Sequence, residues 1–296
     1  MPKKRNDWLL GFFLAAIMVL FILVFASIAS RKRVGTETTI PVSSGGARIA
    51  AVEMNGAFYS SDRIVKQFKI LGEQKSVKAV VLRIDSPGGT VGSAQEIYDA
   101  VRRVRDGGKP VVVSMGDVAA SGGYYAACGA DTIMANPGTT TGSIGVVAEF
   151  PSIDGLLDKI GIRINVIKSG RYKDTGSPYR SLTEEDRVYL QSWINDAYDQ
   201  FVDMITKERE LSRQKVLALA DGRVFTGRQA KELGLIDLLG TYEDAITLAA
   251  KMAGIEGKPT VVKIVTRRGT LLDLLFQESE RLSRGVAGAR LMYKLL

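Results

Sequence analysis

Serine and lysine side chains are the groups in this sequence that can perform nucleophilic catalysis. The chain of 296 residues contains no histidine and a single cysteine, Cys128. Without histidine, Ser-His-Asp and Cys-His catalysis and the HExxH zinc site are excluded. One cysteine excludes an internal disulfide framework and a four-thiolate metal centre. A serine nucleophile here therefore needs another base, and a lysine can serve if burial lowers its pKa from about 10.4 towards neutrality.

Ser121 lies among small residues, in the run Ala119-Ala120-Ser121-Gly122-Gly123. An apolar run at 110–114, which we predict as a buried strand, precedes it. A tight turn from strand to helix at this point would expose the serine Oγ, as in a nucleophile elbow, and the Gly122 amide could donate to an oxyanion. A serine that only caps a helix explains the same pattern equally well.

A second loop, Asp85-Ser86-Pro87-Gly88-Gly89-Thr90, follows the apolar run at 78–84. Ligand sites of open α/β sheets favour the carboxyl ends of strands. Paired glycines allow the backbone to approach a ligand closely and leave N–H groups to point at developing negative charge. An ordinary turn between strand and helix is the alternative. A phosphate-binding loop is excluded because the GxxxxGK[ST] pattern is absent.

Two lysines, Lys168 and Lys173, follow the apolar run at 162–167 and are candidate bases by position. A solvated surface lysine is the more common role for each, and composition does not choose between them. Cys128 is predicted to be a small buried apolar residue, because it has no histidine partner. The SxxK match at 212–215 has polar surroundings and lacks companion motifs, so we interpret it as a helix start.

Short apolar runs and helical patterns alternate along the chain between these loops. Runs rich in β-branched residues that alternate with helices predict parallel strands covered on both faces, so the fold class is α/β. The predicted strands are 48–54, 78–84, 110–114 and 162–167, and the predicted helices are 62–73, 91–105, 188–210 and 244–252.

The N-terminus carries a predicted membrane anchor. Residues 8–29 contain no charge, and a helix of that length spans roughly 33 Å, enough to cross a bilayer core. We interpret residues 1–33 as an uncleaved signal anchor and 34–47 as a flexible tether. A cleaved secretory signal ending at Ser27-Ile28-Ala29 is the alternative. Basic residues flank the segment equally on both sides, so the positive-inside rule gives no orientation.

The net charge of +8 is confined to the two ends of the chain. Residues 34–265 contain as many acidic as basic residues, and the excess lies in 1–33 and in the basic C-terminal tail, 266–296. This distribution, with little interleaving of aromatic and basic residues, argues against nucleic-acid binding. We expect the tail to be flexible or to lean on a membrane.

Five motifs in one order across residues 48–265 resemble the signal peptide peptidase A family, in its short, single-domain form. Each motif alone is weak, whereas five in register are specific. The motifs are DSPGG (85–89), ASGGYY (120–125), TGSIGV (141–146), SGRYKDTGSP (169–178) and RVFTGRQAKELGLID (223–237). The resemblance implies a peptidase domain over residues 48–265 with a Clp/crotonase-like fold of stacked ββα units.

The resemblance also assigns the site. It implies Ser121 as nucleophile and Lys173, rather than Lys168, as general base, with the Gly89 and Gly122 amides as the oxyanion hole. Gly89 rather than Gly88 is carried over from the related Clp-type loop. No metal or other cofactor is implied.

The same resemblance implies partners and a location. The substrates would be cleaved signal peptides that remain in the membrane, with small residues preferred beside the cut. The assembly would be a homo-oligomeric ring whose sites combine Ser121 of one chain with Lys173 of its neighbour. The protein would be a single-pass protein of the inner (cytoplasmic) membrane with its catalytic domain on the extracytoplasmic side.

Two other functions compete with the peptidase. A crotonase-type acyl-CoA enzyme would use a similar oxyanion loop but would need neither the Ser121–Lys173 pair nor an anchor. A non-catalytic membrane scaffold would keep the fold for assembly alone. Hydrolysis of a signal-peptide-like substrate separates the peptidase from both.

Overall fold

The computed structural model describes residues 18, 38–39, 47–266 and 292–294. The chain divides into two units, residues 1–39 with 265–268 and residues 40–264 with 269–296. In the first unit, β1 (Thr38–Thr39) pairs antiparallel with β11 (Val265–Thr266). The predicted anchor at 8–29 falls outside the described residues apart from Met18. Among the helices that are described, none combines the length and apolar character needed to cross a membrane.

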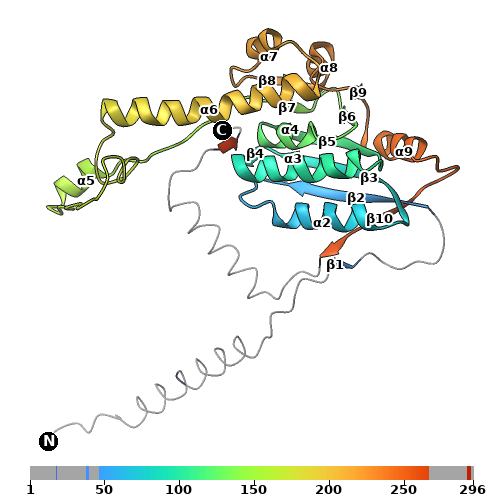
Figure 1. The fold of residues 1–296 in the computed structure, drawn as a ribbon, viewed down its shortest axis with the longest axis horizontal. Helices are drawn as coiled ribbons and strands as arrows, with labels where there is room; N and C mark the ends of the chain where they lie inside the picture. Colours follow the sequence, from blue (N-terminus) through green and yellow to red (C-terminus); the bar gives the residue numbers. More distant parts are fainter. Residues whose placement is uncertain (1–17, 19–37, 40–46, 267–291, 295–296) are drawn as a thin grey trace, which may run out of the picture. The chain divides into compact units, whose positions relative to one another are not determined.

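An eight-stranded, mostly parallel sheet forms the centre of the second unit (Figure 1). Six strands follow the order β10-β2-β3-β5-β6-β9 with parallel pairing throughout. Off this path, β7 pairs parallel with β5 and antiparallel with β8. The strands are β2 (Arg48–Asn55), β3 (Val77–Ser86), β5 (Val111–Ala120), β6 (Thr132–Ala135), β7 (Thr140–Gly142), β8 (Val224–Thr226), β9 (Leu238–Leu239) and β10 (Thr260–Lys263).

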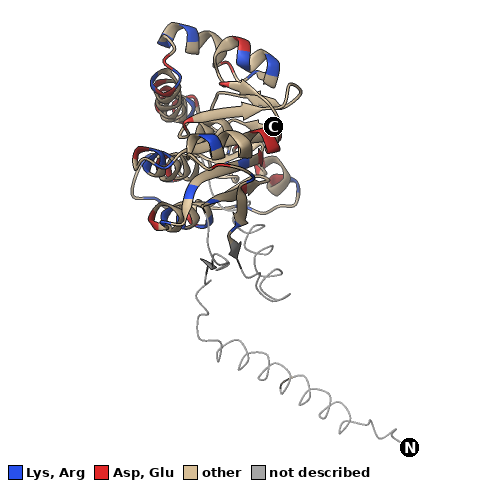
Figure 2. Cartoon of the chain, turned by 90° about the vertical axis from the view of Figure 1, so that its right-hand side faces the viewer, with Lys and Arg blue, Asp and Glu red and all other residues tan. Residues whose placement is uncertain are grey.

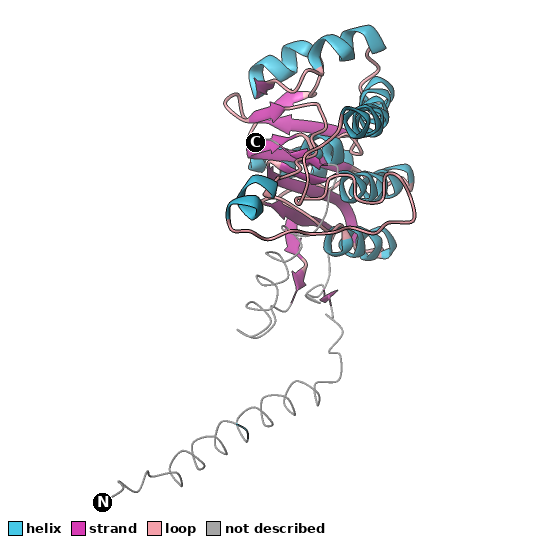
Figure 3. Cartoon of the chain, turned by 90° about the vertical axis from the view of Figure 1, so that its left-hand side faces the viewer, coloured by secondary structure: helices cyan, strands magenta, loops and turns pink. Residues whose placement is uncertain are grey.

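Helices cover both faces of this sheet, as Figure 3 shows from the side. In β3, Val80 and Leu82 pack in one apolar cluster with residues of α2, α3 and α6, whereas Ala79 and Val81 pack in a second cluster with α9. Successive side chains of a strand point to opposite faces, so both faces are buried. The α/β prediction is confirmed. The helices are α2 (Asp62–Glu73), α3 (Val91–Asp106), α4 (Gly122–Ala127), α5 (Asp154–Lys159), α6 (Glu184–Glu208), α7 (Arg213–Leu219), α8 (Gly227–Leu233) and α9 (Tyr242–Met252).

Hydrogen-bonded caps explain where the later helices begin. The predicted helix at 188–210 starts earlier, at Glu184, because Thr183 and Asp186 form a reciprocal capping box. Ser212 caps α7 by accepting from the Lys215 amide at 3.2 Å, which confirms that the SxxK match is a helix start. Basic and acidic residues lie intermixed along the helices (Figure 2), in keeping with the balanced charge of residues 34–265.

The prediction of a strand at 162–167 is wrong. These residues form no strand, and their apolar side chains are exposed, Ile167 completely. A β-branched run becomes a strand only where another strand satisfies its backbone, and this part of the chain has no such neighbour. It belongs to residues 151–183, here called the arm, which project from the sheet with α5 near their tip (Figure 1). No residue of the arm is buried.

Part of the C-terminal tail is ordered. Residues Met292–Lys294 form β12, which pairs antiparallel with β4 (Gly88–Thr90), so that Tyr293 faces Gly89. Tyr293 is completely buried. At these three residues the expectation of a flexible or membrane-leaning tail does not hold, because the Tyr293 ring packs against Tyr125 and Phe201 and the backbone pairs with β4.

Candidate active site

Ser121 lies at the sharp turn between β5 and α4. Its backbone has φ 54° and ψ −116°, a conformation that L-residues avoid and that costs on the order of 1–3 kcal/mol. Two backbone hydrogen bonds hold it there. The Ser121 amide donates to the Gly142 carbonyl at 2.7 Å, and its carbonyl accepts from the Tyr125 amide at 2.8 Å. Such a strained turn is the geometry of a nucleophile elbow.

The Ser121 hydroxyl has no hydrogen-bond partner among the described residues, although the residue is only 1% exposed. It stands at the N-cap position of α4, yet its side chain accepts no capping hydrogen bond. The helix-cap alternative therefore fails for this serine. A buried hydroxyl without a partner costs about 1–3 kcal/mol, and orphan polar groups of this kind call for a functional explanation.

Backbone atoms of the two glycine motifs meet beside Ser121. A Cβ atom at Gly122 would lie 3.0 Å from the Gly89 nitrogen, and one at Gly88 would lie 2.9 Å from the Gly122 nitrogen. A Cβ at Gly89 would lie 2.0 Å from the Phe58 carbonyl oxygen, so no larger residue fits without movement of the backbone. Gly88 also has φ 111°, which favours glycine. The Gly89 and Gly122 amides are thus close neighbours at the carboxyl end of the sheet.

The polar residues of the DSPGG motif shape this loop. Asp85 accepts a hydrogen bond from the Val118 amide at 3.1 Å, where the register of β3 against β5 shifts. The Ser86 hydroxyl donates to the Gly56 carbonyl at 2.7 Å and accepts from the Gly88 amide at 3.2 Å. These bonds fix the path of the chain between the end of β3 and the glycines.

The TGSIGV and RVFTG motifs brace the strand that carries Ser121. β7 pairs parallel with the last residues of β5, and the Thr141 hydroxyl donates to the Ala119 carbonyl at 2.7 Å. β8 then pairs with the other edge of β7. Tyr124, next to the nucleophile turn, donates its hydroxyl proton to the Leu235 carbonyl at 2.8 Å. Four of the five motifs therefore surround one turn.

Lys173, in the remaining motif at 169–178, lies on the exposed arm. Its side chain forms no hydrogen bond or ion pair with any described residue, and the unpartnered Ser121 hydroxyl shows that the two are not bonded within one chain. Lys168 is engaged: its Nζ contacts Asp174 at 2.5 Å and the Arg171 carbonyl at 3.0 Å. The structure thus gathers Ser121, Gly89 and Gly122 and leaves Lys173 outside the group.

The C-terminal strand β12 lies beside the glycines, between β4 and Val147. We call the space between these two edges the groove. On one side β12 pairs with β4, and on the other Met292 bridges Val147 through two hydrogen bonds of 3.0 Å. The Tyr293 carbonyl oxygen lies 2.1 Å from the position that a Cβ at Gly88 would take. The Tyr293 ring stacks on Tyr125 at 5.2 Å, and its hydroxyl donates to the Ala197 carbonyl at 2.9 Å. Extended backbone held between two strand edges is how peptides bind by β-augmentation.

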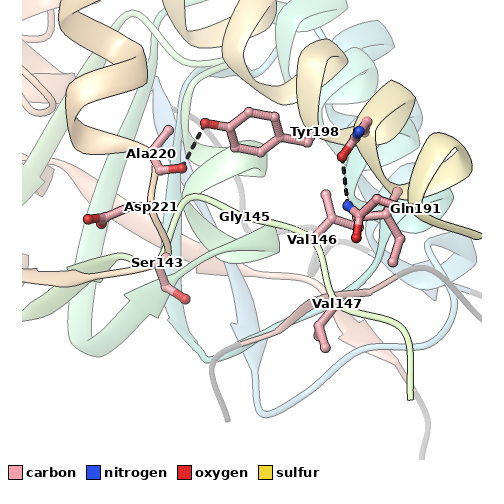
Figure 4. A pocket seen from close by; sticks show the side chains of 11 residues that line it. Ser143, Gly145, Val146, Val147, Gln191, Tyr198, Ala220 and Asp221 are labelled. Atoms are coloured by element: carbon pink, nitrogen blue, oxygen red, sulfur yellow. Dashed lines mark hydrogen bonds between the residues drawn. The ribbon is translucent and has the colours of Figure 1, made fainter. Parts of the chain in front are cut away.

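A cavity of about 530 Å³ lies between residues 143–147 and α6 (Figure 4). Tyr198 closes one side, with its hydroxyl donating to the Ala220 carbonyl at 2.8 Å. Val147, the bridge partner of Met292, also lines it. The cavity is therefore next to the groove, and Ser121 is not among its lining residues.

Cys128 is buried in the core, and this burial raises the pKa of its thiol to about 12. A thiol with such a pKa is not ionised at neutral pH and is a poor nucleophile. The prediction that Cys128 is a buried apolar residue is confirmed. Sequence reasoning missed Tyr293, because a lone tyrosine in a basic tail carries no pattern. It also missed Arg180 and Asp186, whose partners only the fold reveals.

Comparison with known proteins identifies the family of this chain. Residues 103–256 match the family "Peptidase family S49", and residues 47–141 match "Clp protease". The chain is 48% identical over 211 residues to "Putative protease slr0021" of Synechocystis, covering 71% of this chain and 76% of that one.

Two further relatives carry more specific names. The chain is 36% identical over 224 residues to "Putative signal peptide peptidase SppA" of Enterococcus faecium, covering 71% of this chain and 65% of that protein. It is 34% identical over 248 residues to the chloroplastic "Serine protease SPPA" of Arabidopsis thaliana, covering 81% of this chain and 36% of the relative. The parallel-rich sheet, the glycine-lined serine turn and these matches agree, and the chain belongs to peptidase family S49.

Proposed function

We propose that this peptidase is a membrane-anchored serine endopeptidase in which Ser121 is the nucleophile and Lys173 is the general base. The observation that carries the proposal is the strained, buried turn at Ser121, whose hydroxyl has no partner and lies beside the Gly89 and Gly122 backbone. A strained backbone and an unpartnered buried hydroxyl both lower the stability of the fold, and a purely structural serine would need neither. A non-catalytic scaffold would gain nothing from either.

The chemistry follows from these groups. Neutral Lys173 takes the proton of the Ser121 hydroxyl, and the serine oxygen attacks the carbonyl carbon of a peptide bond. The Gly89 and Gly122 amides stabilise the negative oxygen of the tetrahedral intermediate, and Lys173 returns the proton to the leaving amine. Water then releases the acyl group from Ser121 by the same steps. No cofactor takes part.

Peptides would bind in the groove that β12 occupies. An incoming peptide in extended conformation would pair with β4 and with Val147, as residues 292–294 do. This arrangement places main-chain carbonyls near the paired glycine amides, where the oxyanion must form. The substrate strand and the C-terminal strand would then compete for one groove.

A complete site would require two chains. Lys173 stands on an arm with no buried residue, and Ser121 has no base within hydrogen-bond distance among the described residues of its own chain. The arm also exposes the apolar run at 162–167, which is β-branched and lacks a strand partner here. Exposed apolar surface of this kind marks protein interaction sites. A head-to-tail ring, in which each arm delivers Lys173 to the next Ser121, would cover this run and complete every site.

The proposed substrates are remnant signal peptides in or at the membrane. Residues 8–29 would anchor the protein by one span in the inner membrane, with the peptidase domain on the extracytoplasmic side. The name of the Enterococcus relative, "Putative signal peptide peptidase SppA", supports this substrate class.

The proposal is tested with the full-length protein in detergent and a fluorogenic signal-peptide-like substrate. Ser121→Ala and Lys173→Ala should each lower kcat by at least about 10³-fold, because each removes a member of the reacting pair. Lys159→Ala, which removes another exposed lysine of the same arm, is the matched control and should retain wild-type turnover. Full activity in Lys173→Ala would exclude this lysine as the base.

Mixed assemblies test whether the site is shared. When equal amounts of Ser121→Ala and Lys173→Ala chains are assembled together, about one quarter of the neighbour pairs unite an intact serine with an intact lysine. Activity should therefore recover to about one quarter of the wild-type rate. No recovery in oligomers shown by mass spectrometry to be mixed would exclude the two-chain site. Absence of hydrolysis by the wild-type protein would favour the scaffold.

A further inference from the structure

One side chain, Arg180, joins two aspartates close to Lys173. The Arg180 guanidinium contacts Asp174 at 2.9 and 3.1 Å, with one nitrogen for each carboxylate oxygen. It also contacts both oxygens of Asp186, at 2.5 and 3.3 Å. Planar, two-pronged pairing of this kind fixes direction as well as distance.

The carboxylates of this cluster are well shielded, although the arm is exposed. The Asp186 side chain is 5% exposed and that of Asp174 is 11% exposed. Isolated ion pairs on a surface contribute little because solvent screens them and both side chains are mobile. A shielded network with several hydrogen bonds for each member holds its geometry much better.

The cluster joins three separate segments of the chain. Lys168, which follows the exposed apolar run, contacts Asp174 at 2.5 Å. Thr175 donates to Asp186 at 2.6 Å, and Asp186 in turn caps the start of α6 through Thr183. The first turn of α6 is thereby connected to the segment on either side of Lys173. Tyr172 also stacks on Tyr189 of α6 with ring centroids 4.8 Å apart, so one aromatic contact acts beside this polar network.

Lys173 is attached directly to this network through its neighbour, Asp174. The backbone on either side of Asp174 forms short turns. The Lys173 amide donates to the Gly170 carbonyl at 3.1 Å, and the Asp174 carbonyl accepts from the Ser177 amide at 3.0 Å. The Asp174 carboxylate therefore helps to hold the Lys173 backbone in place, and Arg180 holds that carboxylate with two hydrogen bonds.

Resting on the proposed role of Lys173 as general base, we propose that Arg180 is a positioning residue for this base. Arg180 does not touch the reacting atoms. Through Asp174 and Asp186 it holds the segment that bears Lys173 against the start of α6, so that the amine reaches Ser121 of the neighbouring chain in one defined geometry. Misplacement of a catalytic group by about 1 Å can cost about 10²-fold in rate.

The test compares Arg180→Ala and Arg180→Lys in the full-length protein. For Arg180→Ala, kcat should fall roughly 10- to 100-fold while KM stays within about twofold, because the groove along β4 is untouched. Arg180→Lys keeps the charge but loses the two-pronged contact, so it should restore only part of kcat.

Arg213→Ala is the matched control. Arg213 also bridges two aspartates of α6, Asp199 and Asp203, but lies on α7, away from the arm. Its removal should leave kcat and KM at wild-type values. Oligomer mass and thermal unfolding are measured for every variant, and they should match the wild type in Arg180→Ala.

Three outcomes would overturn the inference. They are wild-type kcat in Arg180→Ala, a rise in KM in place of a fall in kcat, and equal loss in Arg180→Ala and Arg180→Lys together with loss of the oligomer. Failure of the dyad is recognised separately, since Lys173→Ala would then remain active. If Lys173→Ala is inactive while Arg180→Ala equals the wild type, only the positioning role is lost.

Discussion

The turn that carries Ser121 and the arm that carries Lys173 are built on opposite principles. The Ser121 turn is enclosed by four sequence motifs, and the side chains on both sides of it are buried. The arm has no buried residue, and it is held by ion pairs and hydrogen bonds centred on Arg180 together with the stacked rings of Tyr172 and Tyr189. Core packing fixes one half of the proposed site, and surface contacts that are mostly polar fix the other.

The two regions have different tasks in the proposed reaction, and each is built for its task. An oxyanion site must hold its donors before the reaction begins, and a close-packed interior supplies that rigidity. A group that is delivered to another chain must stand away from its own core, so it cannot be held by that core. Shielded ion pairs give it a defined direction while leaving it accessible.

An added methyl group should lower kcat strongly in the Ser121 turn and leave it unchanged in the arm. Gly89→Ala should lower kcat by at least about 10²-fold, because its Cβ would meet the Phe58 carbonyl at 2.0 Å and displace the oxyanion amides. Gly155→Ala in α5 is the matched control, since nothing lies within 4 Å of its Cβ, and it should keep wild-type activity. Peptide hydrolysis and thermal unfolding measure both. Activity of Gly89→Ala within about twofold of the wild type would contradict the rigid-turn interpretation.

Removal of the C-terminal strand should raise the rate of peptide hydrolysis, because it opens the groove beside Ser121. If β12 leaves the groove open about 10% of the time, a chain lacking residues 292–296 should hydrolyse a short peptide about tenfold faster at low substrate concentration. Tyr293→Phe keeps the stacked ring and loses the hydrogen bond to Ala197, worth about 1 kcal/mol, so it should give a smaller increase. Slower hydrolysis with a lower unfolding temperature would instead make β12 part of the framework.

Acid should loosen the arm before the Ser121 turn. The Arg180 guanidinium holds the pKa values of Asp174 and Asp186 below their usual range. Carboxylates with lowered pKa stabilise the folded arm above their unfolded pKa of about 3.9, and this contribution is lost as the pH falls through and below that value. Amide hydrogen exchange, corrected for intrinsic rates, should show constant arm protection from pH 7 to about 5 and a decline below about 4. Earlier loss of protection in β5 and α4 would contradict the comparison.

Composition and local pattern were enough to predict the available chemistry and most of the framework. The absence of histidine directs any serine catalysis to a lysine, and the alternation of β-branched runs with helical patterns predicted an α/β sheet covered on both faces. The helix at 62–73 was predicted to the residue, because local amphipathic periodicity and tertiary burial agree there. Composition and local pattern are enough where both point to the same structure.

Features that depend on partners distant in the sequence could be recognised only in the folded chain. The run at 162–167 has the composition of a strand but finds no neighbour in this chain, and Tyr293 reaches the glycine groove from a tail without any motif. The choice between a helix cap and an elbow at Ser121 rested on a backbone angle and an unpartnered hydroxyl. Hydrogen-bond partners, strand edges and strained angles are properties of the folded chain, and local sequence does not encode them.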